Sequence, residues 1–582
     1  MNNMNLNNFV NNAVQKSMNG LSIVEREIVV SLLQSRTIDE QQLAIVVQEY
    51  KKKQQDLPSI LVGLGFVTHT KMDEILQKYY NIQHVILDRF TPDINLMKNL
   101  HKNTMITNRF TPFQIIRNEI HVATSEPLDS KIKEIVNLSF GQKYEIKLYY
   151  APSQDVIHFI SSAYLIAENK LSKATKLLQD DMLFSENTSK STRIEESGVV
   201  DFMSCLLEDA VLKNVSDIHI EPQEQFIRFR YRIDGKLASA IHINKYYWHA
   251  ISIRIKVLSH MNIAESRKPQ DGRIEMIVCG RPIDFRLSCQ PGIYGEKFVI
   301  RILDKSKSLV SLEKLGFSKW NYGKMKQSID RPAGITIITG PTGSGKTTTL
   351  YSMLSYLNKV DTNIMTLEDP VEYTVPLVFQ TQVKDGSLFT FEDGIRSAMR
   401  QDPDILLIGE VRDKQTAEAA LRASLTGHKV LTTLHTVDAI TTIQRLVDIG
   451  IERYMISGNL DSVIAQRLVR VLCLHCKVPH TEFSETEKMI ADKFQHINIT
   501  NAFKATGCEH CRHTGYRGRT TVAEILHVTP EIDDLILSSA PKHKMLETAK
   551  KQSFRTIQED ALYKVAEGMI SLDDARMSVI LI

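Results

Sequence analysis

Apolar and polar positions alternate with different periods along the chain, and each period predicts a kind of element. Residues 37–54 (TIDEQQLAIVVQEYKKKQ) and 68–80 (THTKMDEILQKYY) place apolar side chains three and four positions apart, as on one face of a helix. Asp39 is placed to cap the first of these helices. A short apolar stretch precedes each one, which indicates a tandem repeat of roughly thirty residues. Residues 118–129 (NEIHVATSEPLD) are expected to form a strand that runs into a turn.

The pattern of polar and apolar residues changes twice in the middle of the chain. Residues 166–195 are polar and rich in Ser, Thr and charge, which predicts a linker. Residues 224–237 (EQFIRFRYRIDGKL) then alternate apolar and basic side chains before Asp234-Gly235, the pattern of a β-hairpin. On this basis we place a small α/β domain at 196–305.

Between residues 334 and 470, short apolar runs alternate with amphipathic segments. GITIITG and DILLIGE have the composition of buried parallel strands, whereas EDGIRSAMRQ and KQTAEAALRASLTG have helical spacing. This order predicts a doubly wound α/β core. The chain after residue 530 is expected to be mainly helical.

Composition narrows the class of protein. The chain has 582 residues, 43% of them hydrophobic and 24% charged, so we expect a globular protein of several domains. A formal net charge of +3 does not demand a polyanionic partner, and no nucleic acid is expected. No apolar run is long enough to span a membrane, and the Asn-rich residues 1–24 lack the blocks of a signal peptide. We therefore expect a cytosolic chain.

Seven cysteines occur, and four of them form two C-x-x-C pairs: Cys473 with Cys476, and Cys508 with Cys511. A redox device would need only one exposed pair opening a helix, and a nucleic-acid finger would bring a basic recognition element, which the mixed charges of the intervening segment lack. Two such pairs instead fit four thiolates on one structural Zn²⁺. Histidines that could compete as ligands, and that we expect to be bystanders, are His475, His510 and His513. The remaining cysteines, expected to be small core residues, are Cys205, Cys279 and Cys289.

Residues 340–348 (GPTGSGKTT) fit the phosphate-binding pattern G-x-x-x-x-G-K-[ST] and lie between a predicted strand and a predicted helix. Backbone N–H groups of such a loop bind phosphate oxygens, Lys346 reaches the β- and γ-phosphates, and the Thr347 hydroxyl ligates Mg²⁺. ATP and Mg²⁺ are therefore the expected ligands. The predicted nucleotide-binding residues are Gly340, Pro341, Thr342, Gly343, Ser344, Gly345, Lys346, Thr347 and Thr348.

Two acidic segments follow the phosphate loop. Residues 402–413 (DPDILLIGEVRD) form a predicted strand that ends in Glu410, placed to hold Mg²⁺ directly or through water. Residues 366–373 (TLEDPVEY) carry Glu368, Asp369 and Glu372, a cluster that can polarise an attacking water. Taken alone, this second cluster fits a solvated turn better than a catalytic site.

These blocks, in this order, resemble the secretion ATPase superfamily, the hexameric motors of type II secretion and type IV pilus assembly. GPTGSGKTTTLY is similar to its Walker A block, TLEDPVEY to its Asp box, RQDPDILLIGEVRD to its Walker B and TGHKVLTTLHTVDA to its His box. The resemblance implies a RecA-like ATPase core over 306–470. It also implies that Glu368 positions water, that Glu410 lies near Mg²⁺, and that His428 and His435 lie near the γ-phosphate. Two further residues, Arg396 and Arg400, match arginines that lie close to the nucleotide, although their spacing alone would equally suit a solvated helix face.

The region before the core also resembles this family. SDIHIEP, IRFRYRIDGKL, RKPQDGRI and YGEKFVIRIL are similar to its PAS-like second N-terminal domain, which packs on the ATPase core of a neighbouring subunit. The resemblance makes Arg228, Arg230 and Arg232 candidates for a basic residue supplied in trans, and a basic surface strand is the plain alternative. We expect strand alternation to present only some of them on the required face.

Residues 25–165 resemble the family's α/β regulatory N-terminal domain, which in some members binds cyclic di-GMP through paired Arg-Leu-Gly motifs and a later Gly. This chain departs from that pattern, with Ser35-Arg36 at a usual glycine and Asp56-Leu57-Pro58 in place of the second motif. Pro58 also removes a backbone donor. We therefore expect docking to a platform or adaptor protein, and cyclic di-GMP binding is the less favoured alternative.

Together these features predict a homohexameric ATPase that drives type IV pilus assembly, held at the inner membrane through a platform protein. A type II secretion ATPase is the nearest alternative, and a nucleic-acid translocase or a non-catalytic scaffold are alternatives of other classes. Within the resembling family a zinc-bound subdomain is typical of assembly and export motors and absent from the retraction branch. The predicted domain ranges are 1–24 (flexible), 25–165, 166–195 (linker), 196–305, 306–470, 471–520 (zinc) and 521–582 (helical).

Overall fold

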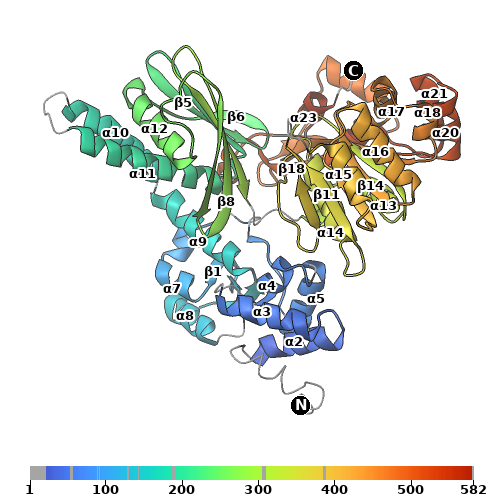
Figure 1. Cartoon of the computed structure of the whole chain (residues 1–582). Helices are drawn as coiled ribbons and strands as arrows, with labels where there is room; N and C mark the ends of the chain where they lie inside the picture. The colour runs from blue at the N-terminus through green and yellow to red at the C-terminus, as the bar shows by residue number, and fades with distance from the viewer. Residues whose placement is uncertain are drawn as a thin grey trace. The chain divides into compact units, whose positions relative to one another are not determined.

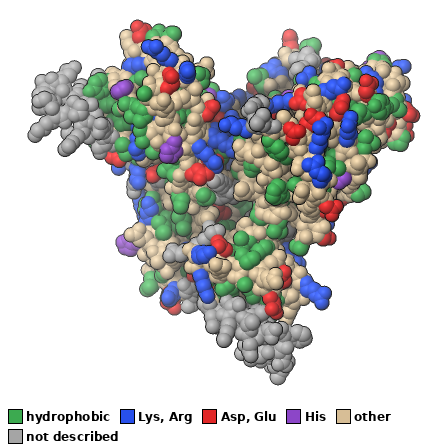
Figure 2. Space-filling view, in the orientation of Figure 1, with side chains coloured by type: hydrophobic (Ala, Val, Ile, Leu, Met, Phe, Trp, Pro, Cys, Tyr) green, Lys and Arg blue, Asp and Glu red, His purple; other side chains and the backbone are tan. Residues whose placement is uncertain are grey.

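The computed structural model describes residues 21, 23–52, 57–67, 69–80, 82–87, 90, 92–127, 130–141, 143–168, 170–185, 191–304, 310–384 and 389–579. The chain forms two compact units, Met1–Ser306 and Lys307–Ile582 (Figure 1). Acidic and basic side chains intermingle on the face drawn in Figure 2, in keeping with the small net charge. Among the described residues, no helix combines the length and apolarity that a membrane crossing needs.

The first unit begins with two copies of one helical hairpin. Helices α2 (Ile23–Gln34) and α4 (Leu57–Gly63) are each followed, two residues after their last residue, by a left-handed residue, Arg36 (φ 52°) and Gly65 (φ 74°). Equivalent hydrogen bonds close both turns, from Thr37 N to Leu32 O and from Phe66 N to Leu61 O. Helices α3 (Glu40–Lys52) and α5 (His69–Tyr80) follow, which confirms both predicted helices and their repeat. Asp39 caps α3 through Gln42 N at 2.8 Å, as expected, whereas Asp56 lies outside the described residues.

A small α/β layer comes next. Its three-stranded sheet has the order β1-β2-β3 and includes the strand expected within 118–129. Its elements are α6 (Ile94–Met97), α7 (Lys102–Thr107), β1 (Phe110–Ile116), β2 (Glu119–Thr124), α8 (Ser130–Phe140), β3 (Glu145–Tyr150) and α9 (Ser153–Glu168).

The segment predicted to be a linker is helical where the structure describes it. Helix α10 (Lys170–Ser185) packs against α11 (Ser191–Leu212) and buries Ala174 and Leu178 in the same core as Val199 and Phe202. The linker prediction for 166–195 was therefore wrong. Two apolar side chains four residues apart suffice to dock an otherwise polar helix, and composition hides so narrow a stripe.

A six-stranded antiparallel sheet completes the first unit, in the order β6-β5-β4-β9-β8-β7. Its elements are β4 (Asp217–Pro222), β5 (Phe226–Ile233), β6 (Lys236–Asn244), α12 (Trp248–Leu258), β7 (Gln270–Val278), β8 (Arg281–Gln290) and β9 (Lys297–Asp304). Side chains of α10, α11 and α12 share one apolar core with the inner face of this sheet. Asp234 (φ 46°) and Gly235 (φ 87°) form the expected hairpin turn between β5 and β6.

The second unit is built on a seven-stranded sheet with the order β12-β11-β13-β14-β10-β15-β18. Every neighbouring pair is parallel except β15 and β18. Its strands are β10 (Gly334–Thr339), β11 (Ile364–Glu368), β12 (Phe379–Gln382), β13 (Ile405–Ile408), β14 (Lys429–Leu434), β15 (Leu460–Leu472) and β18 (Tyr516–His527). A separate two-stranded sheet pairs β16 (Val478–Pro479) with β17 (Phe503–Lys504).

Helices cover both faces of the seven-stranded sheet, which gives the three layers of a RecA-like P-loop core. One apolar core joins the sheet to side chains of α15, α16, α17, α20 and α21, and the other joins it to α13 and α14. The helices of this unit are α13 (Lys319–Ile329), α14 (Lys346–Leu357), α15 (Phe391–Ala398), α16 (Lys414–Leu425), α17 (Ala439–Asp448), α18 (Arg453–Ile456), α19 (Glu485–Lys493), α20 (Pro530–Leu537), α21 (Lys542–Lys551), α22 (Ile557–Ala566) and α23 (Leu572–Ser578).

Candidate functional site

The predicted phosphate loop joins the carboxyl end of β10 to the amino end of α14. Gly340 adopts a φ of 146°, and a Cβ there would lie 2.5 Å from the Gln466 carbonyl oxygen, so only glycine fits. Gly343 and Gly345 are also left-handed. Lys346 Nζ donates to the carbonyls of Gly340 (2.9 Å) and Pro341 (3.2 Å), which keeps the ammonium within the loop.

Glu410 and His435 lie at the same edge of the sheet as this loop. Strands β13 and β14 are parallel neighbours, and each ends just before one of these residues. His435 Nε2 is 3.8 Å from Glu410 Oε2, and Arg412 pairs with the other Glu410 oxygen. Burial lowers the pKa of Lys346 and the Glu410 charge opposes that shift, while burial and then Lys346 lower the pKa of His435. The structure thus brings together a lysine, a glutamate and a histidine whose pKa is lowered by burial and by the neighbouring Lys346.

Glu368, at the end of β11, is tied into a buried network. Its Oε1 accepts from Thr366 Oγ1 (2.6 Å) and Gln380 Nε2 (3.1 Å), and its Oε2 accepts from the Tyr351 hydroxyl. Tyr351 belongs to α14, the helix that starts in the phosphate loop, and its hydroxyl also accepts from Glu372 N at 3.3 Å. This network holds the Asp box against the phosphate-loop helix. The role of Glu368 in positioning water stays a prediction.

Among the described residues, three predicted site residues make hydrogen bonds and ion pairs away from the phosphate loop and Glu410. His428 precedes β14, so it lies about 23 Å along the strand from His435. Its Nδ1 contacts the Thr426 hydroxyl (2.9 Å). Arg396 pairs with Glu392 at 2.6 Å, and Arg400 donates to the Arg396 carbonyl at 2.9 Å.

The amino-terminal edge of the sheet holds Arg400 as well. Asn363, which precedes β11, donates to the carbonyl of Gln401 at 2.8 Å and so places the turn after α15 beside the start of that strand. His428 and Arg400 therefore lie at the opposite edge of the sheet from the phosphate loop.

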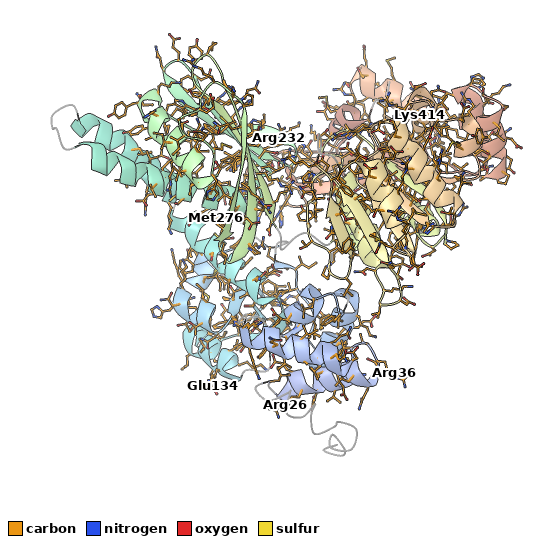
Figure 3. The ribbon with its side chains drawn as sticks, in the orientation of Figure 1. Arg26, Arg36, Glu134, Arg232, Met276 and Lys414 are labelled. Carbon is orange, nitrogen blue, oxygen red and sulfur yellow. The ribbon has the colours of Figure 1, made fainter. Side chains whose placement is uncertain are left out.

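The three candidate trans arginines share one face of β5 in the first unit. The prediction that alternation would divide them was wrong, because positions that differ by two point to the same side of a strand. Arg228 and Arg230 pair with Glu221 at 3.0 and 2.7 Å, and Arg232 (Figure 3) pairs with Asp217 at 3.4 Å. Lys297 and Arg301 of β9 join the same two carboxylates, at 2.9 and 3.1 Å. The outer face of this sheet therefore carries more cations than anions along β5, β4 and β9.

The four paired cysteines converge in the second unit. Their Sγ atoms all lie within 4.8 Å of one another, and Cys473–Cys508, Cys476–Cys511 and Cys508–Cys511 are each 3.8 Å apart. Four thiolates about 2.3 Å from a tetrahedral Zn²⁺ would be about 3.8 Å apart, so the arrangement fits zinc. Cys511 Sγ also accepts from the N–H groups of Cys508 and Gly515, both at 3.1 Å. Such a closed thiolate set suits a structural metal.

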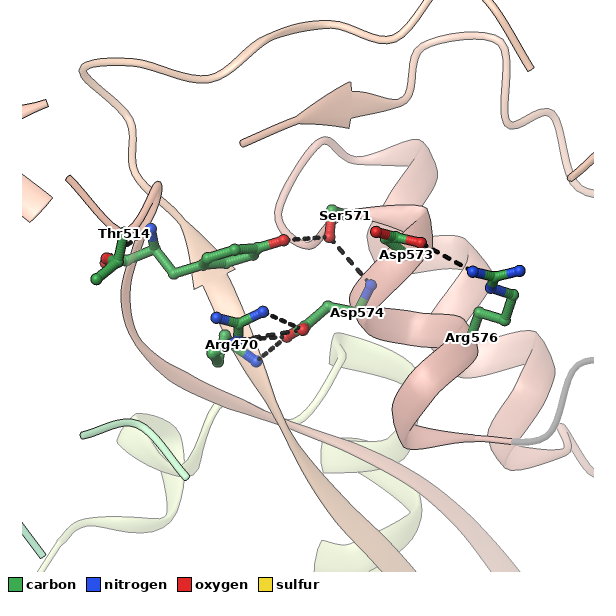
Figure 4. Close-up of polar contacts among 7 residues, drawn as sticks. Arg470, Thr514, Ser571, Asp573, Asp574 and Arg576 are labelled. Atoms are coloured by element: carbon green, nitrogen blue, oxygen red, sulfur yellow. Dashed lines mark hydrogen bonds and ion pairs between the residues drawn. The ribbon is translucent and has the colours of Figure 1, made fainter. Parts of the chain in front are cut away.

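The strands that flank this cysteine cluster, β15 and β18, contact the start of helix α23 through the side chains drawn in Figure 4. Arg470, three residues before Cys473, donates from Nε to both oxygens of Asp574 in α23 at 3.1 Å. Its guanidinium also lies 3.6 Å from the ring centroid of Tyr516, whose hydroxyl contacts Ser571 Oγ at 2.9 Å. Both flanks of the cysteine-bearing segment are therefore anchored to helix α23.

Sequence reasoning missed several polar residues that shape the site. Gln466 contacts the phosphate loop, and Arg467 donates to the Val437 carbonyl at 2.9 Å, just after His435. Glu524 of β18 accepts from the N–H groups of Ala439 (2.7 Å) and Ile557 (2.9 Å), and burial raises its pKa to about 7. The signal in the sequence was polar residues within a buried strand, such as the Gln-Arg pair after the apolar VIA in SVIAQRLVR.

Comparison with known proteins agrees with this geometry. Residues 193–577 match the model of the family described as "Type II/IV secretion system protein", and residues 80–170 match the MshEN domain. The type IV pilus assembly ATPase PilB of Myxococcus xanthus is 35% identical over 553 residues, which cover 93% of this chain and 97% of that one. The type II secretion system ATPase E of Vibrio cholerae is 39% identical over 445 residues, which cover 76% and 86%.

Among solved structures, the ATPase DotB of Legionella pneumophila aligns with a TM-score of 0.49 at 24% identity, over 65% of this chain and 94% of its own. The family match covers well over half of the sequence, and the P-loop lies within it. The chain therefore belongs to the type II/IV secretion system protein family and is a P-loop ATPase.

Proposed function

We propose that this protein is the motor of type IV pilus assembly, a cytoplasmic homohexamer that hydrolyses MgATP beneath the inner membrane. The similarity to a type IV pilus assembly ATPase over 93% of the chain carries the proposal, because it includes the N-terminal region. That region would dock to the platform protein or an adaptor. A type II secretion motor is the second candidate, since an ATPase of that system is 39% identical over 76% of the chain.

Each residue of the site has its own role in the proposed chemistry. Thr347 and Glu410 would hold Mg²⁺, whose charge offsets that of the phosphates, and Lys346 would bind the β- and γ-phosphates. Glu368 would position water. His435 would lie near the γ-phosphate and couple its hydrolysis to movement of the core. Arginines of a neighbouring subunit would complete the site, from the set Arg228, Arg230, Arg232, Arg396 and Arg400. The four cysteines would hold Zn²⁺ in a structural subdomain.

We also propose the following division of the chain into domains. The regulatory or docking domain would span 25–165 and the PAS-like domain 196–305. The RecA-like core at 306–470 would then carry a zinc subdomain at 471–520 and a C-terminal part at 521–582.

Changing Glu368 to Gln is expected to lower kcat for MgATP by about 10²-fold or more, because an amide cannot polarise water as a carboxylate does. Tyr351→Phe removes one of the three donors to Glu368 and should cost about tenfold, since the carboxylate keeps its charge but loses part of its orientation. Steady-state phosphate release measures both. A larger loss for Glu372→Gln than for Glu368→Gln would instead assign water positioning to Glu372.

The cellular role is tested by deleting the gene and restoring it as wild type or as Glu410→Gln. We expect surface pili to disappear on deletion and to return only with the wild type, while secretion of exoproteins is unchanged. Loss of exoprotein secretion with pili intact would assign the chain to type II secretion. Stimulation of the purified ATPase by DNA but not by its platform protein would make it a nucleic-acid motor.

A further inference from the structure

We propose that Gln466 of β15 is a positioning residue for the phosphate loop and thereby sets the affinity for the nucleotide. This inference rests on the proposed binding of MgATP. Gln466 is fully buried, at 0% exposure, and its side chain lies between the loop and the helix that follows it. Nε2 donates to the Ser344 carbonyl at 2.8 Å, and Oε1 accepts from the Thr349 hydroxyl at 3.0 Å.

The chemistry of the partners fixes how this amide is turned. The Ser344 carbonyl can only accept, so the nitrogen of the amide must face it. The Thr349 hydroxyl is then left to donate to the amide oxygen. Both hydrogen bonds are satisfied in one orientation only, so Gln466 is a rigid bridge between the loop and the first turn of α14.

Holding one carbonyl also sets the direction of a donor. In a trans peptide the C=O and N–H groups point in opposite directions, so a Ser344 carbonyl turned toward Gln466 turns the Gly345 N–H away from β15. Backbone N–H groups of this loop are the groups that bind phosphate oxygens. Gln466 therefore orients a phosphate donor without touching the phosphate.

Two glycines of the phosphate loop lie close against Gln466 of β15. A Cβ on Gly340 would lie 2.5 Å from the Gln466 carbonyl oxygen, and a Cβ on Gly345 would lie 3.2 Å from its Nε2. Thr339, the last residue of β10, pairs with Ala465, so the loop leaves its strand directly beside Gln466. The loop glycines thus admit the backbone and the side chain of Gln466.

Gln466→Leu, which nearly keeps the volume and removes both hydrogen bonds, should weaken MgADP binding by about tenfold. The measurement is calorimetric titration of MgADP into the full-length protein, with the melting temperature recorded for each variant. KM for MgATP should rise by a similar factor and kcat should change much less, because loop donors bind substrate and transition state alike.

Ser462→Ala is the matched control. Ser462 is also fully buried on β15 and bonds to Thr336 Oγ1 at 3.3 Å, and none of its hydrogen bonds involves the phosphate loop. It should lower the melting temperature as Gln466→Leu does and leave MgADP affinity unchanged. Thr349→Val, which removes only the bond that orients the amide, should weaken affinity by about threefold and should add nothing to Gln466→Leu.

Affinity within twofold of wild type in Gln466→Leu would overturn this assignment and leave the proposed ATPase intact. If Gln466→Leu does not fold, the MgADP affinity of Thr349→Val is the deciding measurement. A wild-type affinity for MgADP in that variant also overturns the assignment. Absence of Lys346-dependent MgADP binding in the wild type would instead refute the proposed function and the assignment together.

Discussion

Replacing Lys346 with alanine is expected to reduce MgATP hydrolysis by about 10³-fold while the protein stays folded. Lys346 is only 9% exposed and its ammonium already lies against the Gly340 and Pro341 carbonyls, so its removal leaves the loop without its cation. Neutralisation of the γ-phosphate is lost with it. Phosphate release by the purified protein at saturating MgATP measures the effect.

Lys414→Ala is the control for this variant. Lys414 lies on the outside of α16 (Figure 3), is 51% exposed and pairs with Glu418 at 3.6 Å, so its loss should leave the rate unchanged. If Lys346→Ala keeps more than a tenth of the wild-type rate, the predicted phosphate site is not the site of hydrolysis.

Substitution of one of the four paired cysteines is expected to have the largest effect on the stability of the fold. Cys511→Ser should abolish tight zinc binding and unfold residues 473–515, because structural zinc contributes on the order of 10 kcal/mol to small domains of this kind. Fast hydrogen exchange over this segment should accompany the loss. It should extend to α23, which is held by Arg470 and Tyr516.

Zinc content is measured by elemental analysis, with Cys205→Ser as the control. Cys205 lies in the first unit, away from the other cysteines in sequence, and its substitution should leave the zinc content unchanged. A wild-type protein purified without chelators that contains no zinc and still protects residues 473–515 from exchange would contradict the zinc assignment.

The parts of the site that could be predicted are those written in consecutive residues. The phosphate loop follows a strand and carries three glycines and a lysine within one short stretch, and Glu410 follows a recognisable apolar run. Hydrophobic period alone predicted the doubly wound class of the core, two of its strands (in GITIITG and DILLIGE) and two of its helices (in EDGIRSAMRQ and KQTAEAALRASLTG). These signals are local, so no knowledge of tertiary contacts was required.

What could not be predicted depends on contacts between distant segments. Glu368 is held by partners from α14, β11 and β12, and Gln466 reaches Ser344 across 122 positions. His428 and His435 share one motif, yet a whole strand separates them. The helical character of 170–185 likewise came from packing against α11, which overrode its polar composition.

The pairing of β15 with β18 has an architectural consequence. Leu472 pairs with Tyr516, and Cys473 N donates to Gly515 O at 2.9 Å, so the chain leaves and re-enters the sheet at one point. The residues between them form an insertion whose two ends are adjacent. A turn of two residues would be enough to close the hairpin at this point. The cysteine-bearing segment is thus an insertion within one hairpin, and Ile490, Ile497 and Ile499 tie it to the second unit because they share a buried cluster with α22 and α23.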